Sequence, residues 1–464
     1  MVNAAASIAT VSPVLLGANM AVWFAQTTPG LAASLQSVGF TAVRYPGGST
    51  SDGYHWEGTT ANPAAPTFCA GGYGNPNSTF DNFMTDVARP ANLDVAITLN
   101  YGSNEACNAG GDPTEAAAWV DYANNTRGYG VHWWTVGNEE FGSWEYDLHA
   151  KKNDATTYAS AVASGYYPDI KAKDPTAMVG VDVEPGWSPA WDPTVLAQAK
   201  YDFVELHWYA QGPGSESDAY LIGSAPDYLA STISSLKTEL ATAGHSGVPI
   251  YLGELGSVSS NPGKQTTSIT QALFAGQVIG QMLNVGIARS TWWLAYGGCN
   301  DAGGGGNFSA SLYGWQNFGG YQMLSDGLPE YGCYGAPAIA RGTLLPTAVV
   351  YQIAAAFAHG GERVFAAPVN ASLPNVRAFA TSQGTKYNVL LFNLDQNSAV
   401  NVPVGVSALA SGSGATVTTY GKAQYDQSKN NVWTGSVTSS LGSWRSSVTV
   451  ALPPWSVTLV SIRP

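Results

Sequence analysis

A regular alternation between short apolar runs and longer stretches of helical periodicity begins at Val14, and it constrains the fold more than any other feature. Such an alternation predicts an α/β fold with a parallel sheet. The predicted strands cover residues 15–23, 41–48, 94–100, 131–139, 177–182, 202–209, 249–254 and 288–294. Eight strands that alternate with helices over about this length predict a (β/α)8 TIM barrel across residues 14–360.

The stretches between the strands carry apolar residues at helical spacing. The predicted helices cover residues 31–38, about 80 onward, 113–124, 154–172, 229–243, 267–283 and 347–358. Pro113 and Thr114 stand near the start of one helix, and Asp154 is a candidate N-cap of the next. The last helix is expected to complete the outer ring of the barrel.

The pattern changes after Gly361. Short runs of alternating apolar and polar residues, such as 376–380, 387–393 and 456–461, are separated by Gly, Ser and Asn turns. This pattern predicts an all-β sandwich over residues 361–464, with residues 4–13 as a candidate additional strand. Neither a repeat nor a linker separates the two domains, so we expect them to pack tightly.

Charged residues make up only 11% of the chain, well below the usual share of about a quarter. Small and uncharged polar residues must therefore cover the surface, which is common in secreted proteins. The net charge is −13 and the 19 basic residues form no run, so nucleic acid is not an expected partner. Because no apolar stretch is long enough to span a bilayer, a membrane is not an expected partner either.

The first residues, Met1 followed by Val-Asn-Ala-Ala-Ala-Ser, have no basic start and no long apolar core, so they predict no signal peptide. A mature secreted enzyme with an added Met1 would begin this way, and so would a cytoplasmic protein. We expect an extracellular or periplasmic location because of the surface composition and the placement of the cysteines.

The four cysteines have no close metal-binding spacing, and all of them lie in Gly-, Asn- and Tyr-rich segments that are typical of loops. We expect two disulfides, Cys69–Cys107 and Cys299–Cys333, because each would join neighbouring loops. Four free thiols are the alternative. The six histidines are scattered and predict no metal site, and no cofactor is expected.

Chemistry in such barrels is located at the C-terminal ends of the strands. The polar or aromatic candidates at these ends are Asn19, Arg44, Asn100, Asn138, Glu139, His207, Tyr209, Glu254 and Trp293. Glycoside hydrolysis needs two carboxyl groups, and Glu139 and Glu254 end the fourth and seventh strands on opposite sides of the mouth. We interpret Glu140 and Glu145 as loop charges, Asp52 and Glu57 as loop residues near the mouth, and Glu205 as a candidate for an ion pair in the core.

Asn-Glu at the end of strand four, with glutamate at the end of strand seven, resembles the retaining glycoside hydrolases of clan A. The runs Arg44-Tyr45-Pro46-Gly47-Gly48 and Gly53-Tyr54-His55-Trp56 resemble the α-L-arabinofuranosidases of glycoside hydrolase family 51. So do Val136-Gly137-Asn138-Glu139 and Phe141-Gly142-Ser143-Trp144-Glu145. That family also carries a C-terminal β-sandwich. Two positions depart from it, because Ser49 stands where it usually has Asn and Leu255 where it usually has Trp.

The resemblance implies that Glu139 is the acid/base and Glu254 the nucleophile. It implies that Asn138 bonds the sugar 2-hydroxyl, that Tyr209 bonds the nucleophile and that Arg44 supports it. The strand ends add His207, Trp293 and Asn100 as candidate substrate-binding residues. Glu139 must hold a proton, and we expect the side chain of Trp133 or Trp134 and the charge of Glu254 to favour its neutral form.

We therefore predict a retaining, exo-acting glycoside hydrolase, an α-L-arabinofuranosidase that removes side groups from plant polysaccharides. One alternative is a β-glucuronidase or β-xylosidase with the same catalytic pair. A glucuronidase would have to bind a carboxylate, for which the Tyr/Gly-rich loop over residues 313–334 is the candidate. The other alternative is a non-catalytic carbohydrate-binding protein on the same scaffold, which would need neither glutamate. The oligomeric state stays open.

Overall fold

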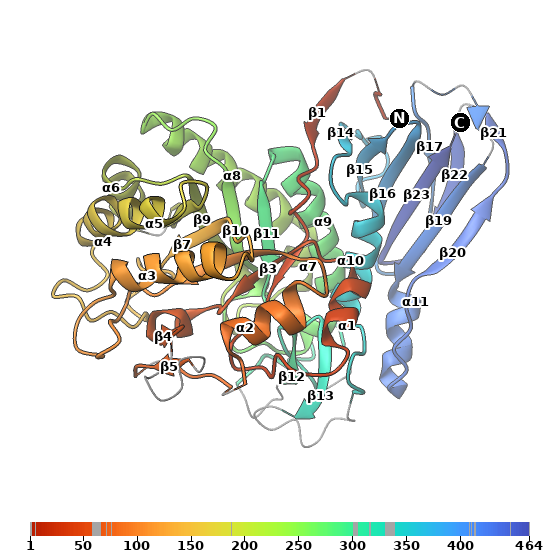
Figure 1. Ribbon diagram of the computed structural model, residues 1–464. Coiled ribbons are helices and arrows are strands. Elements are labelled where there is room, and N and C mark those ends of the chain that lie inside the picture. Colours follow the sequence, from red (N-terminus) through yellow and green to blue (C-terminus); the bar gives the residue numbers. More distant parts are fainter. Residues whose placement is uncertain are drawn as a thin grey trace.

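The computed structural model describes residues 2–4, 6–57, 66–70, 72–75, 77–186, 188–299, 305–314, 317–329, 339–407, 409, 411–412, 414–445 and 447–463. A closed parallel barrel lies beside an antiparallel β region, and the N- and C-terminal ends both lie at the β region (Figure 1). The predicted fold class, a TIM barrel followed by an all-β sandwich, is confirmed.

The closed barrel consists of parallel strands, and each of them overlaps one of the predicted runs. In barrel order the strands are β2 (Gly17–Asn19), β3 (Ala42–Tyr45), β6 (Asp94–Leu99), β7 (Trp133–Val136), β8 (Met178–Val183), β9 (Phe203–Gln211), β10 (Ile250–Val258) and β11 (Arg289–Trp292). β11 pairs with β2 and closes the ring. β9 and β10 continue past their predicted ends, so Glu254 lies within its strand and not at its last residue.

Helices surround the barrel, and most of them lie where the apolar spacing predicts. They are α1 (Leu31–Val38), α2 (Phe80–Asn82), α3 (Pro113–Val120), α4 (Ala155–Ala161), α5 (Tyr167–Lys173), α6 (Trp191–Gln198), α7 (Asp218–Gly223), α8 (Ala225–Thr242), α9 (Ile269–Val285) and α10 (Pro346–Phe357). The sequence patterns did not predict α6 and α7. Asp154 caps α4 as expected, since its carboxylate accepts a hydrogen bond from the backbone N–H of Thr157 at 2.9 Å.

The β region has two layers. Its large sheet runs in the order β1 (Ser7–Thr10), β14 (Arg363–Phe365), β15 (Val376–Gln383), β16 (Lys386–Asn393), β23 (Ser456–Arg463), β19 (Gly414–Gly421) and β20 (Val437–Leu441). The pair β17 (Val400–Val404) and β22 (Val448–Leu452) covers one face of it, with Leu391, Val402 and Ile462 in the core between the layers. The antiparallel pairing of β1 with β14 ties the N-terminal segment to this region. The domain bounds at 14–360 and 361–464 stay a prediction.

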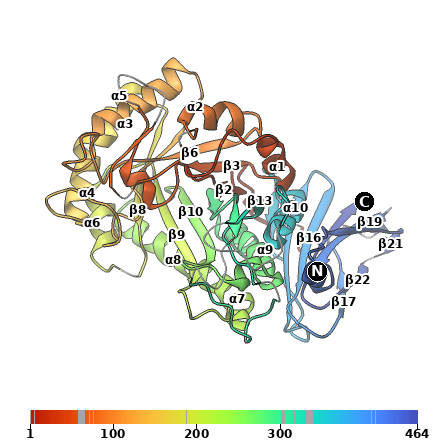
Figure 2. The ribbon, with the colours of Figure 1, turned by 90° about the horizontal axis from the view of Figure 1, so that it is seen from below.

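The other face of the large sheet packs against α9 and α10, as two views of the molecule show (Figures 1 and 2). Phe379 and Phe392 of the sheet belong to the same apolar cluster as the barrel helices. A Cβ at Gly280 of α9 would overlap the ring of Phe379, so the close approach of helix and sheet requires glycine there. One continuous core thus holds the β region firmly on the barrel.

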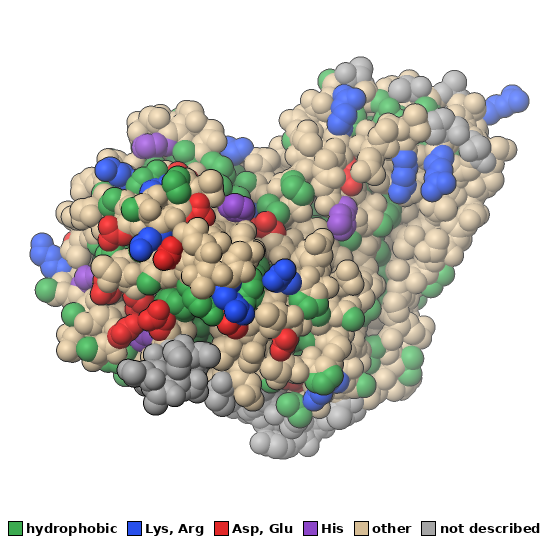
Figure 3. Space-filling model, in the orientation of Figure 1, with side chains coloured by type: hydrophobic (Ala, Val, Ile, Leu, Met, Phe, Trp, Pro, Cys, Tyr) green, Lys and Arg blue, Asp and Glu red, His purple; other side chains and the backbone are tan. Residues whose placement is uncertain are grey.

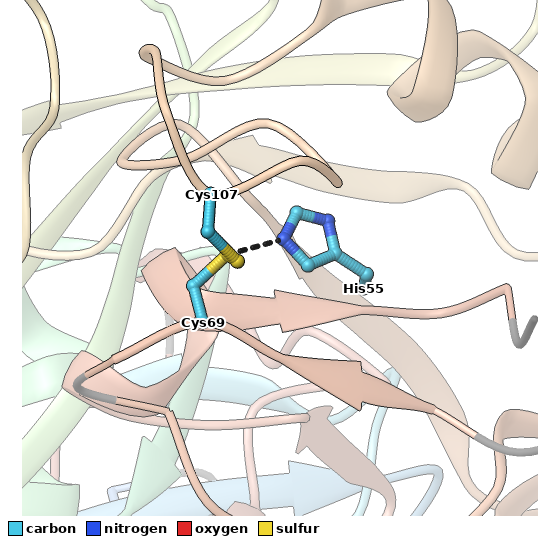
Figure 4. Close-up of side chains that lie close together, drawn as sticks. All are labelled: His55, Cys69 and Cys107. Atoms are coloured by element: carbon cyan, nitrogen blue, oxygen red, sulfur yellow. Dashed lines mark hydrogen bonds between the residues drawn. A yellow bond between two sulfur atoms is a disulfide. The ribbon is translucent and has the colours of Figure 1, made fainter.

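A disulfide joins Cys69 to Cys107, which confirms the first predicted pairing. Cys69 follows β5 (Thr67–Phe68) and Cys107 lies in the loop after β6, so the bond fastens two long loops to each other. The ring of His55 lies beside the bond, with its Nε2 atom 3.2 Å from Sγ of Cys69 (Figure 4). The second predicted pairing, Cys299–Cys333, cannot be placed because Cys333 lies outside the described residues.

Uncharged side chains and backbone cover much of the face seen in Figure 3, as the low share of charged residues leads one to expect. None of the helices in the described part of the chain combines the length and the apolar character that a membrane span needs.

Candidate active site

The chain turns sharply where β7 ends, and this turn places Glu139 in the mouth of the barrel. Gly137 has a φ of 80°, and a Cβ at this position would overlap the side chain of Glu140. Glu139 itself has a φ of 52°, a conformation that non-glycine residues rarely adopt and that is concentrated at functional sites. The glycine therefore permits a turn that carries the next two side chains away from the strand.

Glu254 reaches the mouth from β10, three strands further round the barrel than β7. The pairing of β10 with β9 has an irregularity between Leu252 and Glu254 that brings Glu254 opposite His207. Oε2 of Glu254 accepts a hydrogen bond of 2.7 Å from the hydroxyl of Tyr209, and Oε1 accepts one of 3.0 Å from Nη1 of Arg44. Both oxygens are therefore held in defined positions.

The carboxylates of Glu139 and Glu254 lie close together with His207 between them. One oxygen of each glutamate and one ring nitrogen of His207 all lie within 4.8 Å of one another. Nδ1 of His207 is 2.8 Å from Oε1 of Glu139 and 3.8 Å from Oε2 of Glu254. The structure thus brings together the two carboxylates that the strand ends predicted.

His207 is held from both sides of its ring. Nδ1 faces Glu139, and Nε2 lies 3.1 Å from Oε1 of Glu205 on the same strand. Burial lowers the pKa of His207, but the charge of Glu254 and the hydrogen bonds to Glu139 and Glu205 outweigh it and raise the pKa well above its usual value. The ring therefore carries a positive charge and donates from both nitrogens.

Glu139 was expected to hold a proton, but in the structure the neighbouring His207 holds it. Burial raises the pKa of Glu139, but the hydrogen bond and charge of His207, together with the hydrogen bond from Trp144, outweigh burial and lower it. Nε1 of Trp144 donates to Oε2 of Glu139 at 2.8 Å. The resting carboxylate is therefore ionised, and Nδ1 of His207, which lies 2.8 Å from Oε1 of Glu139, carries the proton.

The predicted wall of Trp133 or Trp134 around Glu139 is wrong. Trp133 packs against Phe203 and Tyr251 inside the barrel, near the start of the strands. Trp134 points outward and packs against Trp119 of α3. Successive side chains of a strand point to opposite faces, so neither can follow the turn that carries Glu139 into the mouth. The indole beside Glu139 comes instead from Trp144, in the loop after the turn.

Arg44 connects the polar residues under the pair. Its Nη2 donates to Oδ1 of Asn138 at 2.8 Å, its Nη1 lies 3.1 Å from Oδ1 of Asn19, and its Nε forms an ion pair of 2.9 Å with Glu205.

 

Burial raises the pKa of Glu205, but the charge of Arg44 and the hydrogen bond from His207 outweigh burial and lower the pKa. Glu205 is therefore ionised, and it forms the core ion pair that the sequence suggested.

Asn138 is held in place by groups that the sequence patterns did not single out. Its Nδ2 donates to Oε1 of Glu145 at 3.0 Å, and the hydroxyl of Ser49 donates to the same oxygen at 2.8 Å. Burial and the nearby charges of Asp52 and Glu139 raise the pKa of Glu145 to about 10, so Glu145 is neutral. Ser49, one of the two departures from the family pattern, is thereby linked to the residue expected to touch the sugar.

The interpretation of Glu140 and Glu145 as loop charges is wrong, because both side chains are buried, and Asp52 is a buried residue of a short 3-10 helix, Ser49–Gly53, and not of a loop. Burial and the neighbouring Asp52 and Asp182 raise the pKa of Glu140 well above its usual value. Burial likewise raises the pKa of Asp52 to about 7, although backbone N–H groups of Tyr101 and Gly102 donate to it. A proton on Glu140 gives Asp52 a hydrogen-bond donor and removes one buried charge.

A cavity of about 1130 Å³ opens over the pair. Besides Asn138, Glu139, His207, Tyr209 and Glu254, aromatic side chains from several loops, from β9 and from α8 line it. These are Trp23, Phe24, Tyr73, Phe141, Trp144, Trp208, Tyr228, Trp293 and Tyr321. Lys and Arg are absent from the described residues that line this cavity. Its walls are therefore apolar rings with a few polar groups, which suits a neutral, hydroxyl-bearing ligand.

Most of the residues predicted from the strand ends meet at this cavity. Arg44 and Asn19 lie just beneath it, and Trp293 forms part of its wall. Asn100 is the exception, because its amide donates to the backbone carbonyl of Tyr54 and to Ser103 and does not line the cavity. Of the missed residues, Trp144 and Glu145 lie in a loop and Ser49 opens a short 3-10 helix, and sequence spacing carries no periodic signal for their contacts.

Two groups in the described part of the chain contain donor atoms that could hold a metal ion. In the first, with His55, the sulfur atoms of Cys69 and Cys107 are joined to each other and are not thiolates. In the second, formed by Glu139, His207 and Glu254, the ring of His207 is charged and Arg44 pairs with Glu254. Neither donor set fits a bound cation.

No protein-family model matches the chain. A probable α-L-arabinofuranosidase C of Aspergillus terreus is 27% identical over 184 residues, which are 36% of this chain and 34% of that protein. An intracellular exo-α-(1→5)-L-arabinofuranosidase of Bifidobacterium longum is 26% identical over 216 residues, 43% of this chain and 37% of that protein. The chain thus spans about a third of the length of these curated relatives.

The α-L-arabinofuranosidase of Thermotoga maritima, solved as an arabinose complex, superposes with a TM-score of 0.75 at 17% identity. The match covers 100% of this chain and 99% of that one. At this identity the likeness shows the fold, a barrel with an accompanying β region. The resemblance expected from the sequence motifs is found in both comparisons.

Proposed function

We propose that the chain is a retaining, exo-acting glycoside hydrolase that removes α-L-arabinofuranosyl residues. The observation that carries the proposal is the close approach of the two carboxylates, whose nearest atoms lie within 4.8 Å together with His207. Retaining glycosidases keep their carboxyl groups about 5–5.5 Å apart, whereas inverting ones need about 6.5–9.5 Å to admit a water molecule. The geometry therefore favours a nucleophile and an acid/base over a pair that activates water directly.

Glu254 acts as the nucleophile in this proposal. Tyr209 and Arg44 hold its two oxygens at 2.7 and 3.0 Å, so it needs little rearrangement to attack the anomeric carbon. As Glu254 forms the bond to carbon, the bond to the leaving oxygen breaks and Glu139 protonates that oxygen. The proton comes from Nδ1 of His207, and its transfer leaves the ring neutral once the charge of Glu254 has been consumed.

The second half of the cycle reverses these proton movements. Glu139, now a carboxylate, takes a proton from a water molecule that attacks the anomeric carbon, and the bond to Glu254 breaks. When Glu254 becomes a carboxylate again, its negative charge favours the positively charged form of His207, so the proton passes back to His207. The sugar leaves with its original anomeric configuration after two inversions, and the residues return to their starting charges.

The identity of the sugar rests on the relatives of the chain, which are α-L-arabinofuranosidases. A β-glucuronidase is disfavoured because the described cavity lining offers no Lys or Arg to a substrate carboxylate. The loop suggested for that role, residues 313–334, lies partly outside the described residues. A β-xylosidase shares the same catalytic pair, and a non-catalytic binder would need neither glutamate. Asn138 is proposed to bond the 2-hydroxyl, with Trp293 against the ring.

We also propose that the protein works in an extracellular or periplasmic setting, supported by the Cys69–Cys107 bond and the low share of charged residues. Its partner is then a carbohydrate. The barrel and the sandwich are proposed as separate domains with bounds at 14–360 and 361–464.

A panel of nitrophenyl glycosides tests the proposal. Turnover is expected on α-L-arabinofuranoside and at most weakly on β-xyloside and β-glucuronide, with the first product released as the α-anomer in proton NMR. The preferred hydrolysis of a xyloside or glucuronide would contradict the sugar assignment. The immediate release of the β-anomer would contradict the retaining mechanism.

A further inference from the structure

The cavity over the catalytic pair is larger than a single sugar requires. Its volume of about 1130 Å³ exceeds the range of about 300–1,000 Å³ that usually encloses a whole drug-sized ligand. One pentose is smaller than such a ligand. The remaining space must therefore hold water or further parts of the substrate.

Exposed aromatic rings are concentrated around this cavity. Among the described residues, the aromatic side chains that are more than half exposed are Tyr73, Trp144 and Tyr228, with exposed fractions of 54%, 51% and 59%. All three line the cavity, whereas the exposed aliphatic residues Ile8, Leu328, Val432 and Val437 do not. Exposed apolar surface that gathers in a groove marks a place where a ligand covers it.

Two of these rings stand on different sides of the barrel mouth. Tyr73 stacks on Trp23, which follows β2, with ring centroids 5.3 Å apart. Tyr228 of α8 lies beside Trp208 of β9, with centroids 6.3 Å apart. We call these pairs the Tyr73 platform and the Tyr228 platform.

The barrel order shows what lies between the two platforms. A line across the mouth from β2 to β9 has β11 and β10 on one side and β3, β6, β7 and β8 on the other. Glu254 belongs to β10 and Glu139 follows β7, so the two carboxylates stand on opposite sides of this line. A chain that touches both platforms must therefore pass over the catalytic pair.

The depth of the catalytic residues decides how such a chain can lie. Glu254 is 5% exposed and Asn138 1% exposed, whereas the platform tyrosines at the rim are more than half exposed. A sugar that reaches Glu254 must descend below the level of the platforms. A main chain held at the rim can place only a side residue at that depth.

We propose that the two platforms bind the main chain of a neutral polysaccharide across the mouth, so that an arabinofuranosyl side group of an internal residue descends between Glu139 and Glu254. The proposal rests on the proposed function and adds the residues that hold the main chain of the substrate. A neutral chain fits better than an anionic one because the described lining contains carboxylates but neither Lys nor Arg. Each platform stacks on the apolar face of a sugar ring, while Gln211, Ser259 and Ser260 offer polar groups nearby.

Tyr73→Ala and Tyr228→Ala test the proposal against Val437→Ala, an equally exposed residue of β20 away from the cavity. The measurement is kcat/KM on a xylan with single arabinofuranosyl side groups, divided by kcat/KM on the nitrophenyl arabinofuranoside. Each tyrosine variant should lower this ratio by about two- to tenfold, the size of an aromatic stacking contact, and the valine variant should leave it unchanged. An unchanged ratio in both tyrosine variants would overturn the proposal.

A binding measurement separates this proposal from the proposed function. In Glu254→Gln, calorimetric titration with the branched xylan fragment should give weaker binding when Tyr73 or Tyr228 is also replaced by alanine. Equal affinity with and without the platforms overturns the inference even if wild-type protein hydrolyses arabinofuranosides. Failure of the wild type on every arabinofuranoside overturns the proposed function instead. Cleavage inside an unbranched xylan chain would also overturn the inference, because the main chain would then reach the carboxylates.

Discussion

Glu139 and Glu140 are neighbours in the chain, yet their environments drive their charges in opposite directions. Glu139 lies at the cavity, where His207 and Trp144 donate to its two oxygens, and its pKa is lowered despite burial. Glu140 points the other way, towards Asp52 and Asp182, and burial beside these acids raises its pKa well above the usual value. The difference teaches that the partner, and not the residue type or its position, decides which carboxylate is ionised.

The same contrast separates two groups of acids behind one cavity. Glu139, Glu205 and Glu254 pair with two cations, Arg44 and His207, and form the ion-paired group, in which the pKa values of Glu139 and Glu205 are lowered. Asp52, Glu140, Glu145 and Asp182 all have raised pKa values, with burial as the largest cause; Glu140, Glu145 and Asp182 are neutral, and the pKa of Asp52 is about 7. The first group contains the proposed catalytic pair, whereas Glu145 and Asp52 of the second hold Asn138 and the backbone at Tyr101 in place.

Removing the nucleophile should produce the largest difference between the two groups. Glu254→Gly is expected to lower kcat by at least about 10⁴-fold on an aryl arabinofuranoside, because the covalent intermediate cannot form. Azide should fill the vacated space and restore turnover by attacking from the same side. Rates measured with increasing azide check this, and full activity without azide would refute the nucleophile assignment.

The adjacent glutamates provide the next test. Glu139→Gln should lower kcat/KM by about 10²–10⁴-fold on a substrate with a poor leaving group, because the acid is lost. The loss should be smaller on a dinitrophenyl glycoside, whose departure needs no proton. Glu140→Gln replaces a neutral acid by a neutral amide and should change kcat/KM by less than about threefold. Equal losses in the two variants would remove the distinction between the neighbours.

Stability should separate the groups as well. Glu205→Gln leaves Arg44 and His207 without a buried partner and is expected to lower the free energy of unfolding by about 3–5 kcal/mol. Asp182→Asn alters a carboxyl group that is already neutral, so its cost should stay below about 1.5 kcal/mol. Urea unfolding of both variants measures the two costs. A larger loss for Asp182→Asn would contradict the assigned charges.

The smallest expected effect is a change in the pH dependence of stability. The pKa of Asp52 is about 7 in the folded protein, above its value of about 3.9 in an unfolded chain. The folded state then binds more protons between these values, so this contribution is complete below about pH 3.9 and is lost as the pH rises through about 7. Asp52→Asn should therefore flatten the decline of stability between pH 5 and 7, by up to about 1.4 kcal/mol per pH unit. Parallel curves for the two proteins would contradict the raised pKa.

Several parts of the fold could be read from the sequence because they depend on periodic patterns. Each barrel strand overlaps a predicted apolar run, and the start of α4 at Asp154 follows from its capping side chain. The helices α6 and α7, of 8 and 6 residues, were missed. Ser49 opens a short 3-10 helix and Trp144 and Glu145 lie in a loop, and no local pattern predicts the contacts of these residues.

The sequence by itself determined the barrel, the change to a β region after Gly361, and two glutamates on strands that end at the same rim. Only the tertiary structure decided that Glu139 is ionised and Glu140 neutral, that Trp144 and not Trp133 or Trp134 contacts Glu139, and that Asn100 lies away from the cavity. The physical reason is the separation along the chain over which each effect acts. Periodicity and capping act between residues close in the chain, whereas burial and charge depend on groups that the fold brings together from distant strands.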